Sequence, residues 1–422
     1  MKDDKRRHKA PLFTKGMKKT HTVLIPSMLD FHFPLLKYAF LSGGFKSEIL
    51  DADVSAREYQ KIVNTGLEFS HGDICFPANL IIGQFISALR SGRYDTCRTA
   101  LLLPQAGGGC RACNYIHLLR KALIKSGFEY VPVISLNVSG VERHPGFSIT
   151  PVMLLTAQAA IYYGDLLMYL YNKTLPYERA SGETERLLKF WIKTLGQKLS
   201  KKKWITPKKM CEVFFLVAQS FSKIKTVKRS VRKICIAGEL YIKFCALGNN
   251  GLERLLRKQN AEIVMGGFVN YMMYLIDSCT LTDHIYGKIS LSGLGAKPLI
   301  KYMSYIQNKM NDALIQFGFE KMTSYKELKS DCSFAASFGE VMGDGWLISA
   351  EVTGALRKNA DGAVIAVPFG CLVSHTCARG IIRDLRNTFP EKSIQAIDFD
   401  SGLSRINQQN RINMILNFCK GE

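Results

Sequence analysis

Three cysteines stand where a helix is expected to begin. Cys75 precedes the predicted helix 78–90, Cys110 follows a predicted strand and opens a helix, and Cys371 lies between a predicted strand and a predicted helix. The positive end of the helix dipole favours the thiolate form of such a cysteine, and the thiolate is the form that binds metals or attacks electrophiles. Soft ligands held on several loops favour an iron–sulfur cluster or zinc over hard cations.

Three consecutive glycines, Gly107, Gly108 and Gly109, stand directly before Cys110. Because they have no side chains, their backbone can approach a bulky group and their amide groups are free to donate hydrogen bonds. The sulfides of a cluster would accept such bonds. A phosphate-binding turn is the alternative, but neither GxxxxGK[ST] nor GxGxxG occurs in the chain.

The other cysteines have simpler explanations. A free cysteine is most often a buried core residue, and we expect this for seven of them, namely Cys97, Cys211, Cys235, Cys245, Cys279, Cys332 and Cys419. The spacing Cys110-x-x-Cys113 could be a redox pair or half of a zinc site, but no second CxxC completes one. His375 could be a ligand, although a hydrogen bond at the start of a helix is the favoured interpretation. No side chain stands out as a general acid or base.

The net charge of the chain is concentrated in two segments. The 57 Lys and Arg exceed the 35 Asp and Glu by 22, and residues 1–20 contribute +6 of this excess while residues 186–233 contribute +14. The second segment can be a solvated helical face, or a surface for nucleic acid, an acidic partner protein or a phosphorylated ligand. Its aromatic residues are scattered and it has no recognisable reader motif, which disfavours nucleic acid.

The sequence favours a cytoplasmic protein without a membrane partner. The 12 Cys are scattered rather than dense, and no apolar run follows the charged N-terminus, as a secretory signal would require. The best candidate for a membrane span, residues 152–171, contains Gln158 and Asp165. Because an Asp in the middle of a membrane span costs about 2.5–3.5 kcal/mol, we expect a buried helix in that segment.

Short apolar runs alternate with helical segments at both ends of the chain, which predicts parallel sheets. The expected strands are 22–27, 99–104 and 131–137 in the first half, and 233–238, 262–266, 362–368 and 394–399 in the second. Residues 150–230 lack strand signals. We therefore predict an α/β fold with two Rossmann-like parallel-sheet domains and a helical insertion, divided into a basic arm (1–20), a first α/β domain (21–149), a helical, basic connector (150–230) and a second α/β domain (231–422).

The chain resembles the acyl-CoA dehydratase activase-related family over nearly its whole length. It is similar to the C-terminal region of the long members, and to the cluster-bearing subunit of 2-hydroxyacyl-CoA dehydratases and the double-cubane cluster proteins. The motifs that carry the resemblance include Cys75-Phe76-Pro77, Ser91-Gly92-Arg93-Tyr94-Asp95, Gln105 through Tyr115, Tyr163-Gly164-Asp165-Leu166-Leu167-Met168, Pro368-Phe369-Gly370-Cys371 and Ile397-Asp398-Phe399-Asp400.

The resemblance implies that Cys75, Cys110 and Cys371 bind an iron–sulfur cluster between the α/β domains, as one four-iron cluster or a double cubane. It implies that Arg111 and the amides of Gly107, Gly108 and Gly109 donate toward sulfur. It also implies electron transfer from an ATP-hydrolysing activator for low-potential reductive or radical chemistry on a small substrate, with an acyl-CoA among the candidates. The alternative is a non-catalytic cluster-binding subunit or scaffold that docks an acidic partner.

The chain departs from the family pattern at several points. Cys113 stands where the family usually has Ser or Thr, and Cys377 has no family counterpart, so either could be an additional ligand or a tolerated thiol. The ATPase modules of the long members are absent, which requires the activator to be a separate chain. A homodimer that shares ligands also fits the cysteine count.

Overall fold

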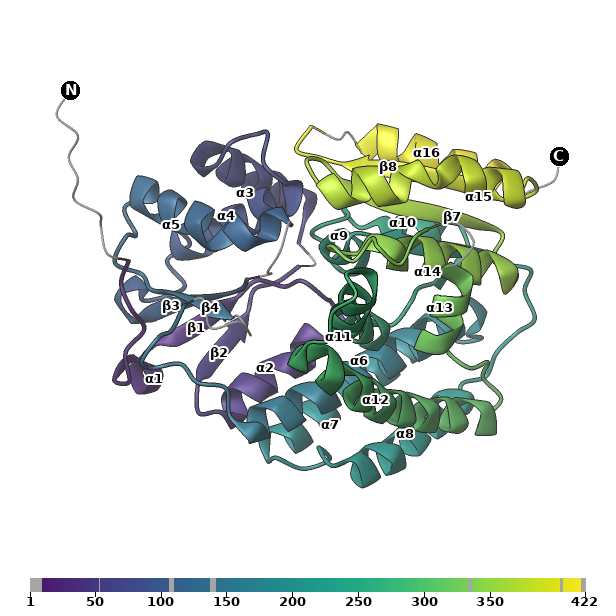
Figure 1. Cartoon of the computed structure of the whole chain (residues 1–422), viewed down its shortest axis with the longest axis horizontal. Helices are drawn as coiled ribbons and strands as arrows, with labels where there is room; N and C mark the ends of the chain where they lie inside the picture. The colour runs from purple at the N-terminus through teal and green to yellow at the C-terminus, as the bar shows by residue number, and fades with distance from the viewer. Residues whose placement is uncertain are drawn as a thin grey trace.

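A computed structural model describes residues 10–52, 54–105, 110–136, 142–332, 336–402 and 405–418. Two four-stranded parallel sheets organise the chain, with strand orders β2-β1-β3-β4 and β6-β5-β7-β8 (Figure 1). The strands are β1 Thr22–Ile25, β2 Lys46–Ile49, β3 Thr99–Pro104, β4 Val133–Leu136, β5 Arg232–Gly238, β6 Ala261–Val264, β7 Gly362–Pro368 and β8 Ser393–Phe399. The predicted α/β fold with two Rossmann-like sheets is confirmed, and the two sheets share one strand order.

Helices cover both faces of the first sheet. The elements are α1 Met17–Thr20, α2 Phe33–Ser42, α3 Ala56–Phe69, α4 Phe76–Leu89, the turn η2 Arg111–Asn114, α5 Tyr115–Ser126 and α6 Pro151–Thr174. Leu24 and Leu101 point toward α3–α5, whereas Val23 and Ala100 point toward α2 and α6, as the alternation of side chains along a strand requires. Strand β2 was not predicted from the sequence, because this edge strand exposes both Lys46 and Glu48 and has no apolar run.

The second sheet is covered in the same way. Its helices are α9 Leu240–Phe244, α10 Leu252–Lys258, α14 Gly345–Arg357, α15 Ile382–Thr388 and α16 Arg405–Phe418. Helices α10 and α16 share a core with Ile234 and Val364, while α14 and α15 pack on Ala363 and Ile365 on the opposite face. Each sheet is therefore buried on both faces, which is why most of its strands are continuous apolar runs.

A helical body lies beside the two sheets and is built from two separate parts of the chain (Figure 1). Its helices are α6, α7 Glu183–Ser200, α8 Pro207–Ser222, α11 Phe268–Ile285, α12 Leu291–Gln316 and α13 Tyr325–Cys332. Tyr163, Phe214, Met273, Met310 and Trp346 belong to its single core. The predicted connector 150–230 is helical, but the body also includes α11–α13, which the sequence-based division assigned to the second α/β domain.

Asp165 lies within the long apolar helix α6 because it caps another helix. Its carboxylate accepts hydrogen bonds from the backbone N–H groups of Phe268 and Val269 at the start of α11, at 2.7 and 2.9 Å. His32 Nε2 lies 2.8 Å from the same carboxylate, and both side chains are fully buried. Along the described part of the chain, no helix combines the length and apolar character that crossing a membrane requires.

We expect Asp165→Ala to lower the free energy of unfolding by about 3–5 kcal/mol, because it leaves two backbone donors and His32 buried without their acceptor. Urea unfolding followed by circular dichroism measures this change. The control is Asp312→Ala, which removes an exposed ion pair with Lys309 and should cost less than about 1 kcal/mol. Equal losses in the two variants would contradict the capping role.

A candidate metal centre where the two sheets meet

The two sheets meet through the loops at the carboxyl ends of their strands. The N–H of Phe76 donates to the carbonyl of Phe369, which follows β7, at 3.0 Å. The N–H of Asp30, which follows β1, donates to the carbonyl of Phe244 in α9 at 3.1 Å. Helix α4 also begins at this edge, since a crossover helix runs antiparallel to the strands it connects. Ligands of open α/β sheets bind at this edge.

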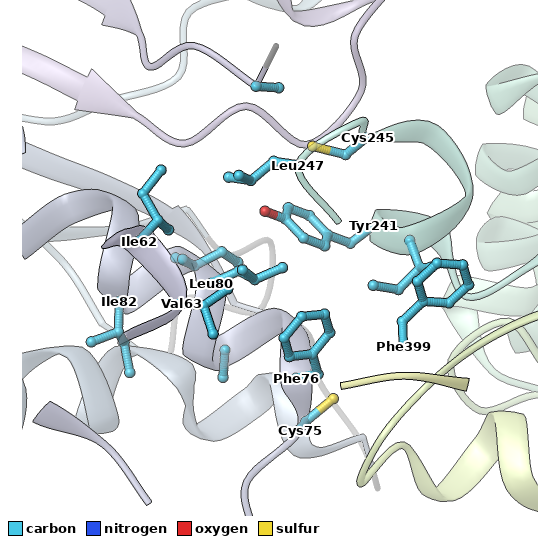
Figure 2. Close-up of a cluster of buried hydrophobic side chains, with 14 of the residues drawn as sticks. Ile62, Val63, Cys75, Phe76, Leu80, Ile82, Tyr241, Cys245, Leu247 and Phe399 are labelled. Carbon is cyan, nitrogen blue, oxygen red and sulfur yellow. The ribbon is translucent and has the colours of Figure 1, made fainter. Parts of the chain in front are cut away.

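An apolar core continues across this junction. Figure 2 shows Cys75, Phe76 and Leu80 of the N-terminal half facing Tyr241 and Phe399 of the C-terminal half. All five side chains are buried in one cluster with residues of both sheets. The loops that carry the candidate ligands are thus supported from both halves of the chain.

Cys75 and Cys371 are in direct contact at the junction. Cys75 is the residue before α4, Cys371 is the third residue after β7, and their thiols share a hydrogen bond. Gly370 permits this approach, because its φ is +72° and a Cβ on it would lie 3.2 Å from the backbone nitrogen of Cys75. A side chain at position 370 would be strained and would separate the two loops.

Cys110 lies at the same junction, at the carboxyl end of β3. Its Sγ accepts a hydrogen bond from the Ala112 N–H at 3.5 Å in the turn η2, and its side chain is half-buried. Burial, with a contribution from the negative charge of Cys371, raises the pKa of Cys110 to about 11. The three cysteines singled out in the sequence are therefore neighbours, although only Cys75 and Cys371 touch.

Hydrogen bonds and burial at the junction favour the thiolate form of Cys371 and the protonated forms of Cys75 and Cys110. The hydrogen bond from Cys75, together with those from Ser374, outweighs burial and lowers the pKa of Cys371 to about 6. The Ser374 hydroxyl and N–H lie 3.2 and 3.4 Å from Cys371 Sγ. The hydrogen bond to Cys371 raises the pKa of Cys75, to which Tyr115 also donates. Cys371 is mainly thiolate at neutral pH.

Two carboxyl groups lie close to Cys371, of which Asp344 is buried and Glu239 is half-buried. Glu239 follows β5 and caps α9 by accepting the Ile242 N–H at 3.0 Å. Burial and the charge of Cys371 raise the pKa of Glu239 to about 8, and burial with the charge of Glu239 raises the pKa of Asp344 well above its usual value. The sequence-based reasoning missed Asp344, whose only signal was its position between two glycines before an apolar helix.

Lys243 and Glu351 form a buried ion pair close to Asp344. Lys243 Nζ lies 2.6 and 2.8 Å from the two carboxylate oxygens of Glu351, and both side chains are less than 5% exposed. Asp344 is close enough to this pair for both charges to act on it. A Cβ on Gly266 would lie 2.0 Å from Glu351 Oε1, so a side chain at this position would force the pair to move.

Arg111 connects two of the cysteine loops. Its guanidinium donates to the Asp73 carbonyl at 3.2 Å, which ties the turn after Cys110 to the loop before Cys75. Donation from Arg111 toward a sulfur, which the resemblance implied, is not among its described contacts. Gly107, Gly108 and Gly109 lie outside the described residues.

The remaining candidates are placed close to these loops. His375 Nδ1 bonds to the Cys371 carbonyl at 2.7 Å, as expected for a hydrogen bond at the start of a helix. Cys377 is half-buried beside Thr376 at 3.7 Å, and Cys113 is half-buried next to the turn that holds Cys110. Neither side chain is in contact with Cys75 or Cys371 among the described interactions.

The cysteines that the sequence analysis assigned to the core differ in how deeply they are buried. Cys235, Cys245 and Cys332 are buried, whereas Cys211 and Cys279 are half-buried. The core assignment of Cys97 is wrong, because its side chain is exposed beside the turn before β3. Cys419 lies outside the described residues.

The donor set at the junction suits a soft metal, since three thiols come from three loops and one of them is already a thiolate. No three His, Cys, Asp or Glu side chains within the described ranges are arranged to hold one metal ion. A cluster with several irons places each thiolate on a different iron, so its ligands need not converge on a point. The donor set is therefore of the kind that binds soft, thiophilic metals, whether as zinc or as an iron–sulfur cluster.

Neither a comparison with protein-family models nor a comparison with curated proteins finds a match for this chain.

Proposed function

We propose that this protein binds an iron–sulfur cluster through Cys75, Cys110 and Cys371 and accepts electrons from a separate ATP-hydrolysing activator. The observation that carries the proposal is the contact of Cys75 with Cys371 across two sheets, with Cys110 beside them. Core filling does not explain it, because two buried thiols, one of them ionised, are held together at the edge where α/β sheets bind ligands.

The neighbouring groups support ligation by these sulfurs. Cys371 needs no proton loss to bind iron, while Cys75 and Cys110 must each release a proton, so loading should release protons. The Ser374 N–H and the Tyr115 hydroxyl can continue to donate to sulfur, and such hydrogen bonds tune the reduction potential of a cluster. When bound, the cluster supplies one-electron transfer.

The resemblance to the 2-hydroxyacyl-CoA dehydratase cluster subunit supports a proposal for the reaction in which the electrons are used. We propose low-potential reductive or radical chemistry on a small substrate in the cytoplasm, with an acyl-CoA among the candidate substrates. The cluster is either one four-iron cubane or a double cubane. We propose that the ATP-hydrolysing activator is a separate chain.

Anaerobic reconstitution with ferrous iron and sulfide tests the cluster. We expect about four irons and four sulfides per chain for a single four-iron cluster, and an electron paramagnetic resonance signal after reduction with dithionite. Less than about one iron per chain, with no signal, would refute the proposal.

Reduction with a candidate activator tests the electron donor. We expect the visible absorption of the cluster to bleach only when activator and ATP are both present. A loaded cluster that ATP and activator leave oxidised would favour the alternative function, a non-catalytic cluster-binding subunit.

A further inference from the structure

A cavity lies at the opposite edge of the second sheet from the cysteines. It has a volume of about 240 Å³, and Ala261, the first residue of β6, is among the residues that line it. Arg179, Arg229 and Arg257 line it, together with Glu178. These arginines come from three separate segments, and only Arg229 belongs to the basic segment 186–233. The fold therefore gathers positive charge here that no local sequence pattern indicated.

A short antiparallel pairing holds two of the three segments together. The Arg179 N–H donates to the Lys225 carbonyl and the Val227 N–H donates to the Tyr177 carbonyl, both at 2.8 Å. Glu178 and Thr226 form the bridge between these bonds. The side chain of Arg229 then donates back to the carbonyls of Pro176 and Glu178, each at 3.4 Å. These contacts hold Arg179 and Arg229 on one wall of the cavity.

Arg257, in the last turn of α10, is held from the other side. Its Nη2 donates to Asn172 Oδ1 at 2.8 Å and to Glu253 at 2.6 Å, and its guanidinium lies 5.0 Å above the ring of Tyr171. It is mostly buried, with 22% of its side chain exposed. A guanidinium fixed in this way loses little freedom when it binds a ligand.

The acidic groups near the cavity do not neutralise all of this charge. Glu253 pairs with Arg257, and the carboxylate of Glu178 accepts the N–H groups of Gly182 and Thr184 at 2.7 and 2.8 Å. Within the described part of the chain, no carboxylate forms an ion pair with Arg179 or Arg229. The cavity therefore presents two guanidinium groups with unused donors to an incoming anion.

We propose that this cavity binds the phosphate groups of a small phosphorylated ligand. Guanidinium groups form paired, charge-assisted hydrogen bonds with phosphate oxygens, and Arg179 and Arg229 offer two such groups to one concave site. A volume of 240 Å³ lies below the range of about 300–1,000 Å³ that is usual for whole drug-sized ligands, so it suits a phosphate or diphosphate moiety. The concave, arginine-lined shape favours a small ligand over an extended nucleic acid, which would contact the exposed lysines as well.

Isothermal titration calorimetry with inorganic pyrophosphate tests this proposal. We expect saturable binding that weakens by at least about tenfold in Arg179→Gln/Arg229→Gln. The charge-matched control is Lys223→Gln/Lys228→Gln, which changes two exposed lysines of the same segment outside the cavity lining and should retain affinity within about twofold. Arg179→Gln alone, which breaks no described side-chain contact, should lower affinity without altering the circular dichroism spectrum.

Two results would overturn the proposal. One is the absence of heat with wild-type protein at millimolar pyrophosphate. The other is an equal loss of pyrophosphate affinity in the double arginine and double lysine variants, because binding would then depend on diffuse charge. If a single-stranded oligonucleotide also bound more tightly than pyrophosphate, with the same equal loss, the ligand would be nucleic acid. Neither result depends on the cysteines, so the test is independent of the cluster.

Discussion

We expect Cys371→Ala to retain less than about one iron per chain after anaerobic reconstitution, whereas Cys377→Ala should keep the wild-type iron content. Cys371 is the thiol that is mainly ionised at neutral pH and the one that Cys75 contacts. Without it, the remaining candidate ligands are two protonated thiols on separate loops. Cys377 is near enough to Cys371 for the charge of Cys371 to act on it, but its side chain bonds to Glu340 and not to another candidate ligand, so its removal should change only local packing.

Colorimetric iron and sulfide analysis, with the absorption spectrum of the reconstituted protein, measures this difference. Cys97→Ala is the control for removing a cysteine that is not a candidate ligand, because the side chain of Cys97 is exposed and remote from the junction. Cys113→Ala addresses the remaining thiol near Cys110 and should also retain iron. Loss of iron in Cys377→Ala but not in Cys371→Ala would reassign the ligand, and full iron content in both would contradict the proposed site.

Breaking the buried pair of Lys243 and Glu351 lowers the free energy of unfolding by about 3–5 kcal/mol, since the remaining charge is left without a partner. Both side chains are less than 5% exposed, so water cannot replace the lost contact. We expect this loss in Lys243→Met. The double variant Lys243→Met/Glu351→Leu should recover most of the stability, because two apolar side chains of similar volume carry no desolvation penalty.

Urea unfolding monitored by tryptophan fluorescence and by circular dichroism measures these energies. The comparison is Lys189→Met on the surface of α7, where the pair with Glu185 is exposed and contributes about 0.5 kcal/mol or less. A double variant as unstable as Lys243→Met would show that packing around Gly266, rather than the unpaired charge, accounts for the loss.

Most strands could be predicted from the sequence because both faces of each sheet are buried. Residues 99–104 and 362–368 are continuous apolar runs, and they form β3 and β7 with these bounds. The edge strand β2 could not be predicted in this way, since both Lys46 and Glu48 are exposed. An edge strand is defined by its hydrogen bonds to a neighbour, and here that neighbour is β1.

Only the tertiary structure could show which helices belong to the helical body and which cover a sheet. Helices α11–α13 lie between two strands of the second sheet in the sequence, which suggested that they cover that sheet. Instead α11 packs on α6 and α12 packs on α8, while α13 packs on α14 and α11 within the same core. Asp165 of α6 caps α11. Periodicity predicts that a helix has an apolar face but contains no information about which other helix buries it.

The candidate site could be predicted in part. The position of Cys75, Cys110 and Cys371 at helix starts and after strands, together with the order of parallel strands, placed all three at carboxyl edges. The sequence could not show that the edges of two different sheets face each other, nor that Ser374, Tyr115, Glu239 and Asp344 surround the thiols. Those relations depend on the packing of Phe76 and Leu80 against Tyr241 and Phe399 across the junction (Figure 2).

The sequence by itself determined the α/β class and the chemical type of the candidate ligands, because apolar periodicity and side-chain identity are local properties of the chain. Only the tertiary structure decided that Cys371 is ionised beside Cys75, and that Arg179, Arg229 and Arg257 share a cavity. Ionisation depends on burial and on hydrogen bonds from residues distant in the sequence, and a cavity exists only once separate segments have packed around it.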